Sequence, residues 1–229
     1  MSLFAISDLH LAFNEEKPMD IFGDNWYMHH EKIKENWIKK IKKEDTVLIA
    51  GDISWSMSME EGLKDLEWIH SLPGKKIFIK GNHDYWWTSI SKLNKLYDDM
   101  SFIQNNFFKY EDYAICGTRG WIQNSSEKFT THDEKVYKRE LIRLKLSLDA
   151  AVKDNMKKII VMIHYPPYND EFKDSDFTEV FKEYKVEKVI YGHLHGINPG
   201  NDFFNRIKDD IEYKLTSCDY LEFDPVKLL

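Results

Sequence analysis

The sequence predicts an α/β fold, on three observations. Short apolar runs alternate with longer amphipathic stretches along the chain. Each apolar run ends in polar residues or glycine. The later part of the chain also carries additional short segments of β character, which indicate a second sheet. Alternating strands and helices are typical of a sheet whose faces are covered by helices.

Five apolar runs have the length and boundaries of buried strands. They are residues 3–7, 46–50, 76–80, 158–163 and 188–192. Within 102–118, two short apolar segments flank Tyr-Glu-Asp-Tyr, a pattern that indicates a hairpin. Residues 211–223 alternate between apolar and polar, and we expect antiparallel strands there.

Four amphipathic stretches predict helices, because apolar residues recur in them at three- or four-residue steps. The stretches are 30–43, 59–72, 133–154 and 176–184. The apolar stripes of the first three contain Ile33, Trp37 and Ile41; Leu63, Leu66 and Ile69; and Val136, Leu141, Leu144 and Leu148. The chain has no internal repeat and no Pro/Gly/Ser-rich linker, so we expect a single domain over residues 1–229.

The composition is that of a folded soluble protein, with 42% hydrophobic and 31% charged residues among 229. A formal charge of −7 argues against a general nucleic-acid binder. The two cysteines, Cys116 and Cys218, lie far apart, and we expect buried reduced thiols. The first residues lack the pattern of a signal peptide, and no apolar run approaches the roughly 18 residues of a membrane span. These features predict a cytoplasmic protein.

Polar residues follow the end of each predicted buried strand. They are Asp8 and His10, Asp52, Asn82 with His83 and Asp84, His164, and His193 with His195. Ligands of open α/β sheets bind beyond the carboxyl ends of the strands. Five of the nine histidines of the chain lie in these segments, so the sequence predicts a functional site at this edge.

The residue types in these segments favour a transition metal. Imidazole nitrogen is mixed with carboxylate and amide oxygen, and no thiolate is present, which suits Mn, Fe or Zn better than Ca. Up to seven ligands exceed the three that one catalytic zinc uses. Two ions fit this number if one carboxylate bridges them, and such pairs stabilise the attacking and leaving oxygens of an in-line displacement. Gly51, Gly81 and Gly192 would let the backbone turn tightly beside the ligands.

The ordered set of motifs resembles the calcineurin-like metallophosphoesterases. In this sequence the set reads Asp8-Leu9-His10, Gly51-Asp52, Gly81-Asn82-His83-Asp84, His164 and Gly192-His193-Leu194-His195. Each motif alone is weak, but the five in order across residues 8–195 are specific. The resemblance implies a four-layer αββα sandwich of two mixed β-sheets flanked by helices.

The resemblance also implies a role for each motif residue. Asp8, His10 and His195 would hold one metal ion, Asn82, His164 and His193 the other, and Asp52 would bridge them. His83 would protonate the leaving group or stabilise the transition state, and Asp84 would orient His83 and keep it protonated. The implied activity is hydrolysis of a phosphate mono- or diester by in-line attack of a metal-bridging hydroxide.

Departures from the family pattern narrow the class of substrate that we expect. Protein phosphatases of the family carry an arginine soon after the bridging aspartate, whereas Ile-Ser-Trp-Ser-Met-Ser follows Asp52 here. They also end the asparagine motif in glutamate, where this chain has Asp84. The chain is therefore more similar to the small bacterial phosphohydrolases of the family, and we expect a small phosphorylated substrate.

Several further residues allow two interpretations. Trp55, Tyr85, Trp86 and Trp87 follow the motifs and could contact substrate, although we expect at least two of the four to be core residues. Arg119 could clamp a substrate phosphate or form a surface salt bridge. The remaining histidines of interest are expected to be solvated: His29, His30, His70 and His132.

Two other functions compete with a phosphoesterase acting on small substrates. A nuclease of the same family is disfavoured by the acidic charge and the lack of a DNA-binding extension. A non-catalytic protein-binding scaffold is disfavoured because no motif ligand is missing.

Overall fold

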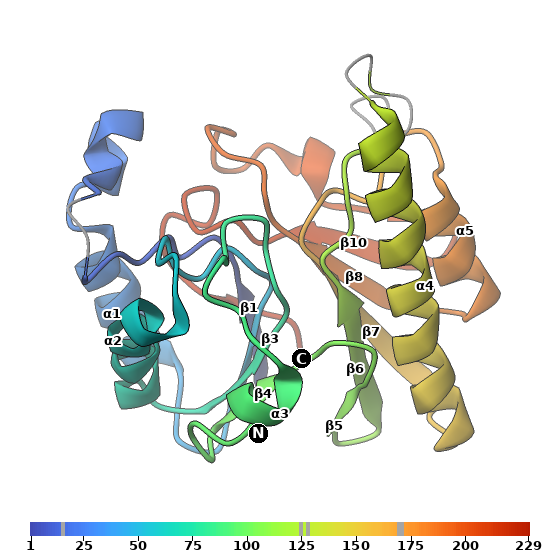
Figure 1. Ribbon diagram of the computed structural model, residues 1–229, viewed down its shortest axis with the longest axis horizontal. Helices are drawn as coiled ribbons and strands as arrows, with labels where there is room; N and C mark the ends of the chain where they lie inside the picture. The colour runs from blue at the N-terminus through green and yellow to red at the C-terminus, as the bar shows by residue number, and fades with distance from the viewer. Residues whose placement is uncertain (15–16, 124–125, 127–128, 169–171) are drawn as a thin grey trace.

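Two β-sheets lie face to face between two layers of helices, as Figure 1 shows. The computed structural model describes residues 1–14, 17–123, 126, 129–168 and 172–229. The first sheet has the strand order β11-β1-β2-β3-β4, and the second has the order β5-β6-β7-β8-β10-β9. The expected αββα sandwich of two mixed sheets is confirmed.

The first sheet is parallel except at one edge, where β11 runs antiparallel to β1. Its strands are β1 (Leu3–Ile6), β2 (Thr46–Ile49), β3 (Lys75–Phe78), β4 (Met100–Phe102) and β11 (Val226–Lys227). Its outer face packs against α1 (His29–Lys40) and α2 (Met59–Ser71). The short helix α3 (Ile90–Leu93) precedes β4.

The second sheet is parallel in its centre and antiparallel at both edges. Its strands are β5 (Phe108–Tyr110), β6 (Tyr113–Thr118), β7 (Lys158–Ile163), β8 (Lys188–Tyr191), β9 (Arg206–Lys208) and β10 (Ile211–Leu215). The helices α4 (Thr131–Lys153) and α5 (Asp176–Glu183) cover its outer face. Three 3₁₀ helices complete the described elements: η1 (Met19–Phe22), η2 (Asp24–Trp26) and η3 (Asp202–Phe204).

The strands read as continuous apolar runs because both faces of each sheet are buried. In β1, Phe4 and Ile6 pack toward α1 and α2, whereas Leu3 and Ala5 join the layer between the two sheets. That middle layer also contains Ile160 of β7, so the two sheets share one core.

The five predicted buried strands and the hairpin around Tyr-Glu-Asp-Tyr are confirmed, the latter as β5 and β6. The four predicted helices also form, although the first ends at Lys40 because Ile41 adopts an extended conformation. Leu63 is exposed, unlike the other residues of the predicted stripe on α2.

The expectation for residues 211–223 is partly wrong. Only Ile211–Leu215 forms a strand, which is antiparallel to β9 and parallel to β8. Residues beyond it enter turns, where Glu222 and Phe223 have left-handed φ angles of 51° and 61°. Apolar residues such as Cys218 and Phe223 are buried by these turns and not by strand alternation.

Both cysteines are buried free thiols, as expected. Within the described parts of the chain, no helix combines the length and the apolarity required to cross a membrane.

Candidate metal centre and active site

The predicted site residues meet where the strand ends of the two sheets approach each other. Asp8, His10, Asp52 and Asn82 follow strands of the first sheet, while the other predicted ligands follow strands of the second. Backbone hydrogen bonds join the sheets here, because Ser7 N donates to Thr216 O (2.7 Å) and Cys218 N donates to Ser7 O (3.0 Å). The loops that carry the ligands are therefore fixed from both sheets.

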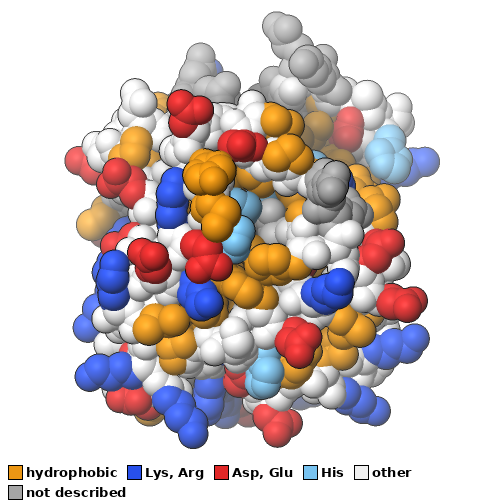
Figure 2. Space-filling view, turned by 90° about the vertical axis from the view of Figure 1, so that its left-hand side faces the viewer, with side chains coloured by type: hydrophobic (Ala, Val, Ile, Leu, Met, Phe, Trp, Pro, Cys, Tyr) orange, Lys and Arg blue, Asp and Glu red, His pale blue; other side chains and the backbone are white. Residues whose placement is uncertain are grey.

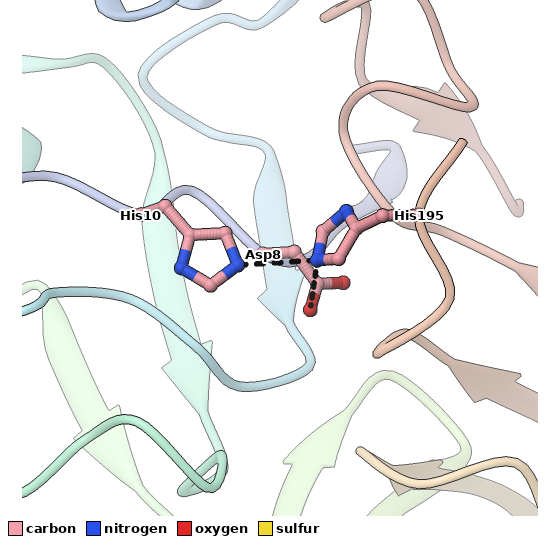
Figure 3. A group of neighbouring side chains, drawn as sticks. All are labelled: Asp8, His10 and His195. Atoms are coloured by element: carbon pink, nitrogen blue, oxygen red, sulfur yellow. Dashed lines mark hydrogen bonds and ion pairs between the residues drawn. The ribbon is translucent and has the colours of Figure 1, made fainter. Parts of the chain in front are cut away.

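Asp8, His10 and His195 form the first group that could hold a metal ion. The Nε2 atoms of His10 and His195 lie 3.2 Å apart, and Asp8 Oδ1 lies 3.8 Å from His195 Nε2. Figure 3 shows the two rings turned toward each other beside the carboxylate, although they come from opposite sheets. A cation between these atoms would be bound by two nitrogens and one oxygen.

Asp52, His164 and His193 form the second such group. His164 Nε2 lies 3.4 Å from Asp52 Oδ2 and 3.3 Å from His193 Nδ1. The amide oxygen of Asn82 lies 2.7 Å from His164 Nε2 and 2.9 Å from His193 Nδ1. Asn82 therefore adds an oxygen donor to this group.

Asp52 is close to both groups. Its Oδ2 atom lies 3.4 Å from His164 Nε2 of the second group and 3.9 Å from His10 Nε2 of the first. Its Oδ1 atom accepts a hydrogen bond from His83 N (2.8 Å), which fixes the carboxylate. The carboxylate is thus held between the two clusters.

Several ligand residues adopt a left-handed backbone conformation that non-glycine residues rarely use. The φ angles are 58° at Asp8, 46° at His10, 50° at Asp52 and 72° at His193. Such conformations cost roughly 1–3 kcal/mol each, and they cluster at functional sites. These conformations direct the ligand side chains toward the two candidate metal groups just after the chain leaves each strand.

Two of the three motif glycines are required for close approach and not for positive φ. A Cβ at Gly81 would lie 2.1 Å from Asp52 Oδ1, and one at Gly192 would lie 2.3 Å from Asp8 Oδ2. Only Gly51 has a left-handed φ, of 93°. The tight backbone expected at these glycines is therefore present, for two different reasons.

Further hydrogen bonds, made by atoms that face away from the two groups, orient the candidate metal-binding side chains. His164 Nδ1 bonds to Ala50 O (3.0 Å), which leaves Nε2 directed at the second group. His195 Nδ1 lies 3.0 Å from Asp219 Oδ1, and Ser7 Oγ donates to Asp8 Oδ2 (2.5 Å). Partners of this kind fix the ring orientation and raise the basicity of metal-binding histidines.

The electrostatics of the cluster fit a cation. Burial by itself would lower the pKa of His164, but the carboxylates of Asp52 and Asp8 raise it to about 9. Burial, followed by repulsion from His164, lowers the pKa of His193 to about 3. The buried carboxylates thus favour positive charge at His164, and a metal ion would supply positive charge in the same place. Nitrogen and oxygen donors without thiolate suit a first-row transition metal.

A cavity of about 400 Å³ opens in front of both groups. Its lining includes His10, Asp52, His193 and His195 together with Met19, Phe22, Asn25, Trp26, Trp55, His83, Gly196 and Asp219. The His83 ring lies 4.2 Å from the Trp55 ring and 5.8 Å from the His10 ring, measured between centroids. His83 therefore faces the place where a ligand of the metal centre would bind.

The expectation that Asp84 orients the His83 ring is wrong. Asp84 Oδ1 accepts hydrogen bonds from Ile53 N, Ser54 N and Trp86 Nε1, and Oδ2 accepts one from Gly81 N (2.7–3.1 Å). Among the described residues, no hydrogen bond to Asp84 comes from the His83 ring. The carboxylate instead ties the Asp52 loop to the loop that carries Asn82. Burial lowers the pKa of His83, against the partial opposition of Asp52.

The aromatic residues divide as expected between core and surface. Trp86 and Trp87 are core residues, at 2% and 9% exposure, so the interpretation of Trp86 as a substrate contact is wrong. Trp55 lines the cavity, and its ring stacks on that of His10 at 4.8 Å. Tyr85 is 59% exposed and is not among the cavity-lining residues.

Arg119 also does not line the cavity of the metal groups. Its guanidinium stacks over Trp121 and lies 3.7 Å from the buried carboxylate of Glu140. The expectation that His29 is solvated is wrong, because its ring is buried and Nε2 bonds to Leu9 O (3.0 Å). His70 and His132 are exposed, as expected, and His30 is half-buried.

Sequence reasoning missed several residues of the site, among them Asp219, Met19, Phe22 and Trp26. Asp219 follows β10, so its position after a strand was a usable signal, but reading residues 211–223 as antiparallel strands hid it. Met19, Phe22 and Trp26 come from η1 and η2, whose sequence shows no periodicity that predicts a regular element.

Comparison with known proteins identifies the family. The family model described as calcineurin-like phosphoesterase matches residues 1–196. The chain belongs to the calcineurin-like phosphoesterase family. Membership implies metal-dependent hydrolysis of phosphoesters, and the two His/Asp groups of this phosphoesterase are candidates for the metal sites.

Similar sequences come from mycobacteriophages. The phosphoesterase is 25% identical to the gene 66 protein of Mycobacterium phage D29 over 190 residues, which cover 82% of this chain and 76% of that protein. It is 37% identical to the gene 66 protein of Mycobacterium phage L5 over 78 residues, which cover 34% and 37% of the two chains.

Solved structures share the fold at low identity. A phosphopantetheinyl hydrolase from Mycobacterium tuberculosis superposes with a TM-score of 0.61 at 15% identity, covering 100% of this chain and 95% of that one. A protein of unknown function from Aquifex aeolicus gives 0.53 at 18% identity, covering 99% and 95%. A protein from Thermus thermophilus gives 0.58 at 12% identity, covering 99% and 97%.

Proposed function

We propose that this chain is a dinuclear metal-dependent phosphoesterase that cleaves small phosphate mono- or diesters. The observation that carries the proposal is the position of Asp52 Oδ2, within 3.9 Å of a donor nitrogen from each of two separate ligand groups. One carboxylate oxygen so placed suits two cations separated by the roughly 3.5–4 Å typical of two-metal hydrolases.

In this proposal the ligands divide according to the two groups. Asp8, His10 and His195 hold one ion; Asn82, His164 and His193 hold the other; and Asp52 is shared. The ions, when bound, lower the pKa of water and neutralise charge on the phosphoryl oxygens. The chain contributes by fixing donors from both sheets beside the cavity. Mn, Fe and Zn are the candidates, because the donors are imidazole, carboxylate and amide.

His83 is proposed to protonate the departing oxygen. It lines the cavity, and its position is fixed through its own backbone, because His83 N donates to Asp52 Oδ1. Burial lowers the pKa of the ring, but a bound phosphate dianion would raise it again, since a nearby negative charge favours imidazolium. Charge stabilisation on the phosphoryl oxygens is the alternative role.

The cavity favours a substrate with an apolar body. Met19, Phe22, Trp26 and Trp55 line it beside the metal-binding histidines, and the Trp55 ring stacks on that of His10. Phe22 is 65% exposed, and hydrophobic side chains are common on the face that carries α1 and α2, as Figure 2 shows. Exposed aromatic surface beside a polar centre suits a phosphoester whose leaving group is aromatic or aliphatic.

Hydrolysis assays test this function directly. With added Mn²⁺, the chain should hydrolyse p-nitrophenyl phosphate or bis(p-nitrophenyl) phosphate, and chelation or Asp52→Asn should abolish turnover. His132→Ala, which alters an exposed histidine, is the matched control and should retain turnover. Faster cleavage of plasmid or single-stranded DNA than of every small ester would favour a nuclease. No turnover of any ester by metal-loaded protein would leave a non-catalytic role.

A further inference from the structure

A second cavity, of about 210 Å³, lies between the ends of β3 and β6 and the first half of α4. Its charged lining consists of Lys80, Arg119, Arg139, Arg143 and Glu140. No residue is shared with the lining of the cavity in front of the metal groups. The two cavities are therefore distinct sites.

The lining of this second cavity carries four cations and one carboxylate. Glu140 is 1% exposed, and its Oε1 atom lies 3.2 Å from Arg139 Nη2, 3.0 Å from Arg143 Nη1 and 3.7 Å from Arg119 Nη2. Its Oε2 atom accepts a hydrogen bond from Thr118 Oγ1 (2.8 Å). One carboxylate, with both oxygens already engaged, is shared among three guanidinium groups.

Some hydrogen-bond donors that line this second cavity have no acceptor. Among the described residues, the Lys80 ammonium forms no hydrogen bond or salt bridge, and Arg119 Nε is buried without an acceptor. A buried donor without a partner is destabilising, so an acceptor from solution would stabilise this arrangement.

We propose that this second cavity binds a small anion with at least two negative charges, of the phosphate type. Guanidinium groups match the paired oxygens of such an anion, and a lysine supplies a compact point charge. The Lys80 ammonium and Arg119 Nε, which have no acceptor among the described residues, are the groups that would bind it.

Binding there would reach the metal centre through the backbone. Lys80 directly precedes Gly81 and Asn82, and the carbonyl of Arg119 accepts hydrogen bonds from His164 N (3.1 Å) and Tyr165 N (3.0 Å). An anion held by these two side chains therefore braces the segments that carry Asn82 and His164.

Titration with inorganic phosphate tests the site with a local readout. The zinc-loaded chain is titrated at constant ionic strength, and the Nε–H resonances of Arg119 and Arg143 are followed by NMR. We expect both resonances to shift and saturate together. Lys80→Met, which keeps the aliphatic stem, should weaken this binding by about tenfold, as expected for loss of one charge-assisted contact.

Two comparisons separate a specific site from general charge attraction. Lys39→Met removes an exposed cation from α1 and should leave the phosphate affinity within about twofold, as expected for a screened surface charge. Arg143→Gln should weaken binding as Lys80→Met does, which guards against a folding defect in either variant. The proposal fails if the resonances do not saturate, or if Lys39→Met weakens binding as much as Lys80→Met.

Discussion

At the scale of single residues, His83 allows a catalytic role to be tested separately from metal binding. Its ring faces the cavity, whereas only its backbone amide is bonded to Asp52, so His83→Ala should leave the metal ligands in place. General acid catalysis contributes about 10²–10⁴-fold. Turnover of alkyl phosphates should therefore fall by that factor, while p-nitrophenyl phosphate, whose leaving group needs no proton, should lose little.

The control for this experiment is His132→Ala, at an exposed position on α4. Equal losses on alkyl and p-nitrophenyl esters would assign His83 to charge stabilisation on the phosphoryl oxygens. Loss of bound metal in His83→Ala would make His83 a ligand and would contradict the division of ligands proposed here.

Asp84 is expected to act through stability and loop geometry. Its carboxylate accepts four hydrogen bonds, three of them from buried backbone amides. Asp84→Asn places an NH₂ group against these donors and should lower the free energy of unfolding by about 3 kcal/mol. Denaturant unfolding measures the change. The control is Asp98→Asn, at an exposed position, which should change the free energy of unfolding by less than about 0.5 kcal/mol. Unchanged stability in Asp84→Asn would refute a structural role.

The residue types of the site were predictable from sequence, but some of their partners were not. Asp8, Asp52 and the motif histidines could be placed because each follows an apolar run at a strand end. The partners of Asp84 could not all be predicted, because two of its donors, Ile53 N and Ser54 N, lie about 30 residues away in the Asp52 loop. The left-handed backbone at the ligands was equally hidden, since nothing in a side-chain pattern specifies positive φ at a non-glycine residue.

At the scale of elements, helix α2 begins with a capping box that can be tested against an uncapped helix. Ser58 Oγ accepts from Glu61 N (3.3 Å), and the Glu61 carboxylate accepts from Ser58 N (3.0 Å). Ser58→Ala should lower the free energy of unfolding by about 1 kcal/mol. Ser89 occupies the same position before α3 but makes no capping hydrogen bond, so Ser89→Ala should change stability by less than about 0.5 kcal/mol. Similar losses in the two variants would contradict this account of α2.

The elements that sequence patterns predicted are those with strong periodicity or continuous apolar character. Strands such as β7 carry six residues with an unbroken apolar core and are recognisable without tertiary context. By contrast, β9 and β11 have two or three residues each and exist only through pairing with a neighbouring strand. The segment with η1 and η2 forms the cavity wall by tertiary packing of Met19 and Trp26.

At the scale of the whole molecule, the candidate metal sites connect the two sheets. The first group combines Asp8 and His10 from the first sheet with His195 from the second, and the second group likewise draws on both. Metal bound only by the folded chain at 100 times its Kd would add about 2.7 kcal/mol of stability, which corresponds to roughly 5–10 °C in Tm. Calorimetry of chelated and Mn²⁺-loaded protein measures this rise. An unchanged Tm at saturating metal would show that the groups do not bind ions in the folded state.

The central claim is that one carboxylate, Asp52, joins two metal sites, and metal content tests it most directly. Elemental analysis of protein dialysed from saturating Mn²⁺ should give about two ions per chain, as in two-metal hydrolases. Asp52→Asn should retain about one or fewer, because the bridging charge is lost, while the exposed Asp98→Asn should retain about two. A wild-type value that stays near one would contradict the two-metal account.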